Sequence, residues 1–330
     1  MKIDVHWHLI PPVFVDAVLS GTCPVDGEIE REGDAITIVL SNGFRQDIFD
    51  RLTDPAIAIA HMDEVGLDVV TPSCAPPMMH YDADIEVAEQ VSRTINDGLA
   101  EAASQYPDRL KPLANLPMAD PGRAVTELRR AVGELGFAGA AIGTNVNGAS
   151  LGDEVFDGFW AAVRDLDCFV FLHPVTPLGG KDRFARHGQS NFVGFPIDSA
   201  AAVASLLFDG VYERFGPLKT CFAHGGGAFP YILSRWEHGY HARQADKLPQ
   251  VKSPMNYLDS IFTDSLTHSE LGLRFLVEVV GKDHVVLGSD YPFDMGVPDP
   301  EAAMNRAIDD ASVREKIAGG TAARLIGISK

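Results

Sequence analysis

The chain has 330 residues, 46% of them hydrophobic, and a formal net charge of -19 at pH 7. This length and composition suit one α/β barrel domain that spans residues 1–330. The negative charge argues against nucleic acid as a partner, because nucleic acid binding draws on Lys and Arg contacts to phosphates. No apolar run approaches the length needed to span a bilayer, and residues 1–20 lack a signal-peptide pattern. We therefore expect no membrane association and a cytoplasmic location.

Apolar, strand-like runs alternate with helix-length segments along almost the whole chain. We expect strands at residues 2–6, 67–72, 110–116, 139–143, 168–173, 218–224, 259–263 and 285–289. We expect helices at residues 55–65, 85–105, 122–135, 153–167, 199–215, 228–242, 269–280 and 299–309. Near-continuous apolar strands that are each followed by a helix are typical of a parallel sheet covered by helices. Eight such units predict a (β/α)8 barrel, the TIM barrel.

Two irregular segments interrupt this alternation. Residues 20–50 contain two strand-like pieces on either side of Gly33-Asp34, which predicts a small β-hairpin inserted after the first strand. Residues 174–196, which follow the fifth strand, are rich in Gly, Pro and charged residues. In a barrel both segments would lie over the C-terminal mouth, where active sites are built.

Candidate metal ligands stand at the ends of several predicted strands. His6 and His8 end the first strand, His173 ends the fifth, and Asp290 follows the eighth. Side chains two residues apart on a strand point to the same side, so His6 and His8 can both face inward. A His-x-His pair alone can also be two polar residues at a strand end. The addition of His173 and Asp290, with His224 at the end of the sixth strand, favours a metal site.

The chain resembles the amidohydrolase superfamily in four motifs. They are DVHWH at residues 4–8, LHP at 172–174, AHGGG at 223–227 and LGSDYPF at 287–293. Within the superfamily the chain is most similar to the branch typified by 2-amino-3-carboxymuconate-6-semialdehyde decarboxylase and related aromatic acid decarboxylases. The resemblance spans nearly the whole chain.

The resemblance implies a role for each motif residue. His6, His8, His173 and Asp290 would bind one divalent metal ion together with a water, and His224 would be a nearby acid/base. Asp290 is a second catalytic candidate, because it can orient that water or share its proton. Binuclear relatives use a modified Lys at the end of the fourth strand, but residues 139–148 contain no Lys, which favours a single ion. Zinc is our first choice, with manganese, cobalt and iron also compatible with these ligands.

The resemblance also suggests residues for substrate binding. Arg45 and Arg235 would hold a substrate carboxylate, since the guanidinium group binds carboxylates through two hydrogen bonds. Arg235 would act in the site of a neighbouring subunit, so we expect a homodimer. Either arginine can instead be a solvated surface cation. A second arginine of the family's inserted segment is not clearly matched, with Phe49 or Arg51 near its place. The glycines at residues 225–227 would present backbone N–H groups near the substrate.

The resemblance implies a metal-dependent nonoxidative decarboxylase, a carbon-carbon lyase that acts on an unsaturated or aromatic carboxylic acid. The alternative is a metal-dependent hydrolase or hydratase that uses the same metal-activated water on a C–C, lactone or amide bond or on a double bond. A metal-binding protein without catalysis is a third hypothesis, which is disfavoured because His224 would then have no task.

Overall fold

A ring of parallel strands forms the centre of the molecule. The computed structural model describes residues 1–180, 182–243 and 252–328. The strands of the ring are β1 (Ile3–His8), β5 (Val69–Ser73), β6 (Leu113–Ala114), β7 (Gly139–Gly143), β10 (Phe169–His173), β11 (Lys219–Phe222), β12 (Ile261–Asp264) and β13 (Val285–Val286). They pair in the orders β1-β5 and β13-β12-β11-β10-β7-β6, and all of these pairs are parallel.

Backbone contacts join these two sheets into a barrel. A parallel bridge links Val70 to Leu110, which lies just before β6. On the other side, the Val5 amide donates to the Leu287 carbonyl at 3.0 Å. The structure therefore confirms the predicted TIM barrel.

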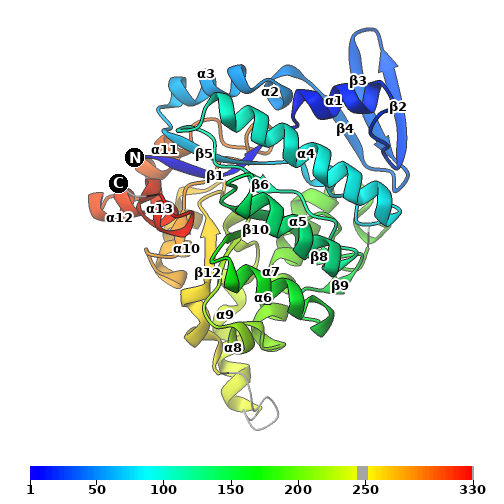
Figure 1. Cartoon of the computed structure of the whole chain (residues 1–330). Helices are drawn as coiled ribbons and strands as arrows, with labels where there is room; N and C mark the ends of the chain where they lie inside the picture. Colours follow the sequence, from blue (N-terminus) through cyan, green and yellow to red (C-terminus); the bar gives the residue numbers. More distant parts are fainter. Residues whose placement is uncertain (181, 244–251, 329–330) are drawn as a thin grey trace.

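Helices cover the outside of the ring (Figure 1). They are α3 (Pro55–Val65), α4 (Ile85–Gln105), α5 (Pro121–Gly133), α6 (Asp157–Asp165), α7 (Phe195–Phe208), α8 (Val211–Phe215), α9 (Phe229–Ala242), α10 (Glu270–Val280), α11 (Pro300–Ala307), α12 (Ala311–Glu315) and α13 (Thr321–Leu325). The prediction of a single helix at residues 199–215 was wrong. This segment is divided between α7 and α8 because Gly210 adopts a left-handed φ of 77°, which a helix cannot continue through.

The burial pattern explains why the strands read as continuous apolar runs. One apolar cluster takes a residue from every strand of the ring, including Val5, Phe171 and Cys221, and therefore fills the barrel interior. Neighbours in sequence such as Leu172 and Phe222 belong to a second cluster that packs between strands and helices. Because both faces of each strand are buried, most strand residues are apolar on both faces.

The insertion after β1 is larger than the hairpin that we expected. β2 (Gly27–Glu32) and β3 (Ala35–Leu40) pair antiparallel around Gly33-Asp34, and β4 (Arg45–Ile48) adds a third strand to β3. Short helices α1 (Pro12–Leu19) and α2 (Asp50–Thr53) flank the sheet, which projects from one side of the barrel in Figure 1. The third strand escaped the pattern because its residues, Arg45-Gln46-Asp47-Ile48, are mostly polar.

One helical stretch contradicts our expectation that no apolar run is long enough to span a bilayer. Within the described residues, Ser190–Phe208 has a mean hydropathy of 1.4 and is long and apolar enough to cross a membrane. A core helix passes the same test. Most of this stretch is α7, which buries Val203, Leu206 and Leu207 in the cluster between strands and helices. All four cysteines are free and buried.

Candidate metal centre and active site

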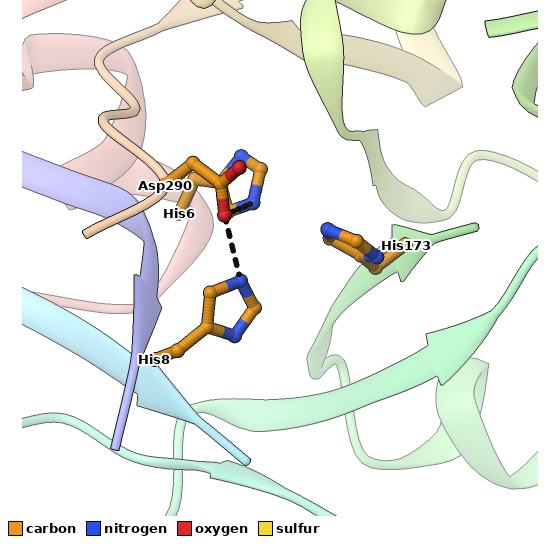
Figure 2. Close-up of side chains that lie close together, drawn as sticks. All are labelled: His6, His8, His173 and Asp290. Atoms are coloured by element: carbon orange, nitrogen blue, oxygen red, sulfur yellow. Dashed lines mark ion pairs between the residues drawn. The ribbon is translucent and has the colours of Figure 1, made fainter. Parts of the chain in front are cut away.

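Four side chains from three strand ends meet at the mouth of the barrel. The candidate ligand atoms of His6, His8, His173 and Asp290 all lie within 4.8 Å of one another, and all four residues are buried. The Oδ1 atom of Asp290 is 3.1 Å from Nε2 of His6 and 3.1 Å from Nε2 of His8. Figure 2 shows His173 facing the other three from the opposite side. Two atoms that each lie about 2.1 Å from one ion are about 3.0–3.4 Å apart, so this spacing fits a shared metal.

Hydrogen bonds leave the correct ring nitrogens available for a metal. Nδ1 of His6 donates to Asp264 at 2.6 Å, and Nδ1 of His173 donates to the Pro174 carbonyl at 2.8 Å. A neutral ring that donates from Nδ1 keeps its lone pair on Nε2. Among the described residues, the buried atoms Nε2 of His6, Nε2 of His8 and Oδ1 of Asp290 have no hydrogen-bond partner. These residues therefore suit one divalent metal ion.

The electrostatics of the cluster also call for a cation. Burial lowers the pKa of His8, and burial together with the neighbouring rings lowers that of His173 well below its usual value. At His6 the carboxylates of Asp290 and Asp264 outweigh burial and raise the pKa to about 10. Burial opposes ionisation of Asp290, but the histidine rings around it hold its pKa well below the usual value. A divalent ion would balance these carboxylates while every imidazole stays neutral for ligation.

His224 stands beside the cluster but outside it. Its Nε2 is 3.7 Å from Oδ2 of Asp290, its ring centroid lies 5.0 Å from that of His173, and its side chain is 17% exposed. The backbone of His224 has a left-handed φ of 56°, which is uncommon for a residue other than glycine. The structure thus places His224 next to the four candidate ligands, but outside the group that could hold a metal.

Asp264 is the residue that sequence reasoning missed. It is the last residue of β12, its side chain is fully buried, and it binds His6 on one side and the backbone of the His224 turn on the other. Our predicted seventh strand ended at Thr263, one residue too early. The signal was present, because an acidic residue directly after an apolar run marks the same edge of the barrel as His173 and Asp290.

The glycine turn after His224 has another task than the one predicted. The backbone N–H groups of residues 225–228 are all used: the first donates to Asp264 and the others to backbone carbonyls. None of these N–H groups is left without a partner for a substrate, contrary to that expectation. The turn needs glycine for packing, because a Cβ atom on Gly227 would lie 2.1 Å from the Pro196 carbonyl oxygen.

A cavity of about 740 Å3 opens above the cluster. Its floor includes His173, His224 and Asp290, and its walls include Phe44 from the insertion and Phe293. Pro174, Val175, Asn191 and Phe195 from the second irregular segment line another side. This volume falls in the range of small-molecule sites. A second cavity of about 420 Å3 also has His224 in its lining.

The candidate substrate-binding arginines and Arg51 have different surroundings. Arg45 lines the cavity, but its side chain is 55% exposed and pairs with Glu30 at 2.5 Å. Arg51 also lines the cavity, and its guanidinium lies over the Tyr291 ring, 5.0 Å from the centroid. No carboxylate of the described residues forms an ion pair with Arg51. Arg235 is exposed on α9 and lines neither cavity.

Fold and site together define a metal-dependent barrel enzyme. Residues 3–328 match the family model described as amidohydrolase (Amidohydro_2), and the chain belongs to this family. The 2-amino-3-carboxymuconate-6-semialdehyde decarboxylase of Dictyostelium discoideum is 33% identical over 336 residues, which cover 99% of this chain and 92% of that protein. The gamma-resorcylate decarboxylase of Polaromonas sp. is 29% identical, with 82% of this chain and 86% of that protein covered.

A solved structure supports the same assignment. The crystal structure of a 2,6-dihydroxybenzoate decarboxylase complexed with 2,6-dihydroxybenzoate matches with a TM-score of 0.82 and 25% identity. The match covers 99% of each chain. The predicted resemblance to the decarboxylase branch of the amidohydrolases is thus confirmed.

Proposed function

We propose that the protein is a metal-dependent nonoxidative decarboxylase that acts on a small aromatic or unsaturated carboxylic acid. The observation that carries this proposal is one histidine, His224, beside a cluster suited to one metal, at the floor of a cavity that also presents arginine side chains. The relatives named as decarboxylases support the reaction type.

In the reaction, the substrate would lose its carboxylate group as CO2, and the carbon that carried this group would gain a proton. His6, His8, His173 and Asp290 would hold the ion, which when bound supplies Lewis acidity and positive charge beside the substrate. His224 would deliver the proton to the carbon that bears the carboxylate, the C–C bond would then break, and CO2 would leave. Asp290 would keep the His224 ring oriented, since its Oδ2 lies 3.7 Å from Nε2.

Arg51 is the best-placed cation for the substrate carboxylate. It follows the insertion, lies next to the ring of Tyr291 and has no carboxylate partner among the described residues, whereas Arg45 is held by Glu30. We assign Arg51 the first contact with the carboxylate and leave Arg45 a supporting role at the cavity wall. Arg235 would contribute only from a second subunit, because it lines neither cavity of its own chain.

A substrate panel tests the proposal. The metal-loaded protein is incubated with hydroxybenzoates, carboxymuconates and lactones, and CO2 and products are followed by mass spectrometry. CO2 release from an acid supports the decarboxylase, whereas products that have gained water without CO2 support the hydrolase or hydratase alternative. With an active acid, Arg51→Gln should raise KM about 10- to 150-fold, the worth of a charged hydrogen bond, and Arg45→Gln should raise it less.

The finer assignments follow from the same site and need their own measurements. We propose zinc as the resident ion, with manganese, cobalt and iron as the alternatives that elemental analysis of the purified protein distinguishes. We also propose a cytoplasmic homodimer with Arg235 acting in trans. Sedimentation would establish the dimer, and mixing inactive Arg235→Ala with inactive His224→Asn protein should restore activity in the mixed dimer.

A further inference from the structure

Asp264 contacts two parts of the site that come from different strands. Its Oδ2 atom accepts from Nδ1 of His6 at 2.6 Å and from the backbone N–H of His224 at 2.9 Å. Its Oδ1 atom accepts from the N–H of Gly225 at 2.7 Å and from that of Leu266 at 3.1 Å. One fully buried carboxylate thus receives four hydrogen bonds.

The chemistry of these four partners restricts what can occupy the position. Three are backbone N–H groups, which can only donate. The fourth is a histidine nitrogen that must carry its proton to join them at the same carboxylate. That requirement places the lone pair of His6 on Nε2, the atom 3.1 Å from Asp290 Oδ1 in the candidate metal site. Asp264 therefore selects the form of His6 that can bind a metal.

The same carboxylate holds His224 in an unfavourable backbone conformation. A left-handed φ is unfavourable for a residue with a Cβ atom, and His224 has a φ of 56°. Hydrogen bonds from the N–H groups of His224 and Gly225 to a charged acceptor offset that strain, because such bonds are about twice as strong as neutral ones. Without them the turn would lose the contacts that hold the His224 ring at the cavity floor.

We propose that Asp264 is a positioning residue that couples the two halves of the site, fixing the His6 ring for metal binding and the His224 backbone for proton transfer. Carboxylates that orient a metal-bound histidine from behind are a general device for tuning metal affinity. Here the same group also anchors the acid/base, so one substitution should disturb both functions. The inference rests on the proposed metal site, and its test requires no substrate.

Asp264→Asn is the informative variant because it keeps the size of the side chain. Its NH2 group must replace one carboxylate oxygen. Placed at Oδ2, it faces the proton of His6, and relief requires that proton to move to Nε2, where it blocks the metal. Placed at Oδ1, it faces the N–H groups of Gly225 and Leu266 and pushes the His224 turn away.

The measurement is the Zn2+ affinity of the full-length protein by chelator competition, without substrate. We expect Asp264→Asn to weaken Zn2+ binding by about 10- to 100-fold. Glu127→Gln is the matched control, because Glu127 is also a buried carboxylate, bonded to Asn96 and Arg130 away from the cluster. The control should lower the unfolding free energy but leave the Zn2+ affinity within about twofold.

A spectroscopic measurement keeps the proposal testable if the variant folds poorly. In the Zn2+-loaded wild-type protein, 15N-histidine NMR should show His6 protonated at Nδ1, with a strongly downfield proton that moves upfield in Asp264→Asn. A wild-type His6 without a proton on Nδ1 would overturn the proposal. So would a folded Asp264→Asn protein with wild-type Zn2+ affinity. Absence of CO2 release with every acid would refute the proposed function but leave these results standing.

Discussion

Replacing Gly227 with alanine probes how the turn that carries His224 is held in place. Gly227 has a φ of 61°, and a Cβ atom there would lie 2.1 Å from the carbonyl oxygen of Pro196, at the start of α7. Real Cβ contacts below 3.0 Å essentially do not occur, so the two backbones would have to separate by about 0.9 Å. That displacement would also weaken the hydrogen bond from the Ala228 amide to the same carbonyl oxygen, now 2.9 Å.

The expected loss of stability has two parts. The left-handed φ costs alanine roughly 1–2 kcal/mol, and overpacking costs about 1–3 kcal/mol. Gly227→Ala should therefore lower the unfolding free energy by about 2–5 kcal/mol. Gly21→Ala is the matched control, because Gly21 has a φ of 75° but no atom within 4 Å of its Cβ position. Gly21→Ala should lose only the roughly 1–2 kcal/mol that the left-handed φ costs.

Urea unfolding and turnover of both variants test this reasoning. Gly227→Ala should also lower kcat, because the displaced turn carries His224, whereas Gly21→Ala should keep the wild-type kcat. Equal losses of stability in the two variants would show that the contact with Pro196 does not constrain the turn. A destabilised Gly227→Ala with unchanged kcat would show that the turn does not control His224.

Three further predictions concern other residues and the metal. Burial lowers the pKa of His80 from 6.5 to about 4 despite nearby carboxylates. As the pH falls, the unfolded chain therefore takes up this proton before the folded protein does. The stability that neutral, buried His80 contributes is complete above pH 6.5 and is lost as the pH falls from 6.5 to about 4. His80→Asn, which tolerates the left-handed φ of 51°, should remove on the order of 3 kcal/mol of this dependence in unfolding titrations; an unchanged slope would contradict it. His224→Asn should lower kcat by about 10²–10⁴-fold while elemental analysis finds wild-type metal content, and unaltered turnover would exclude the acid/base role. Chelation of a metal present at 100 times its Kd should lower the unfolding free energy by about 2.7 kcal/mol, and a chelator without effect on unfolding would argue against the site.

Much of the fold was predictable because the barrel strands are buried on both faces. Runs such as Phe169–His173 are apolar up to their last residue, and that polar last residue marks the mouth of the barrel. β4 was not predictable in this way, because it packs at the edge of a small inserted sheet where polar residues such as Arg45 stay exposed. The break at Gly210 shows the same limit, since one left-handed residue divides an otherwise continuous helical pattern.

The candidate ligands were easier to predict than the residues that support them. His6, His8, His173 and Asp290 come from residue types that metals require, at strand ends that a barrel brings together. Asp264 also ends a barrel strand, but its role depends on hydrogen bonds to His6 and to the turn after β11, which only the folded chain shows. The contrast between Arg45 and Arg51 likewise depends on a partner, Glu30, that only the folded insertion supplies.

The proposed reaction is tested most directly by isotopes. An acid that the panel shows to be turned over, labelled with 13C in its carboxylate, is incubated with the metal-loaded protein in H2 18O and D2O. We predict that the label leaves as 13CO2 in a 1:1 ratio with product, that the product carries one solvent-derived deuterium at the former carboxylate carbon, and that it contains no 18O. A product that retains the 13C label and gains 18O would contradict decarboxylation and establish hydrolysis or hydration instead.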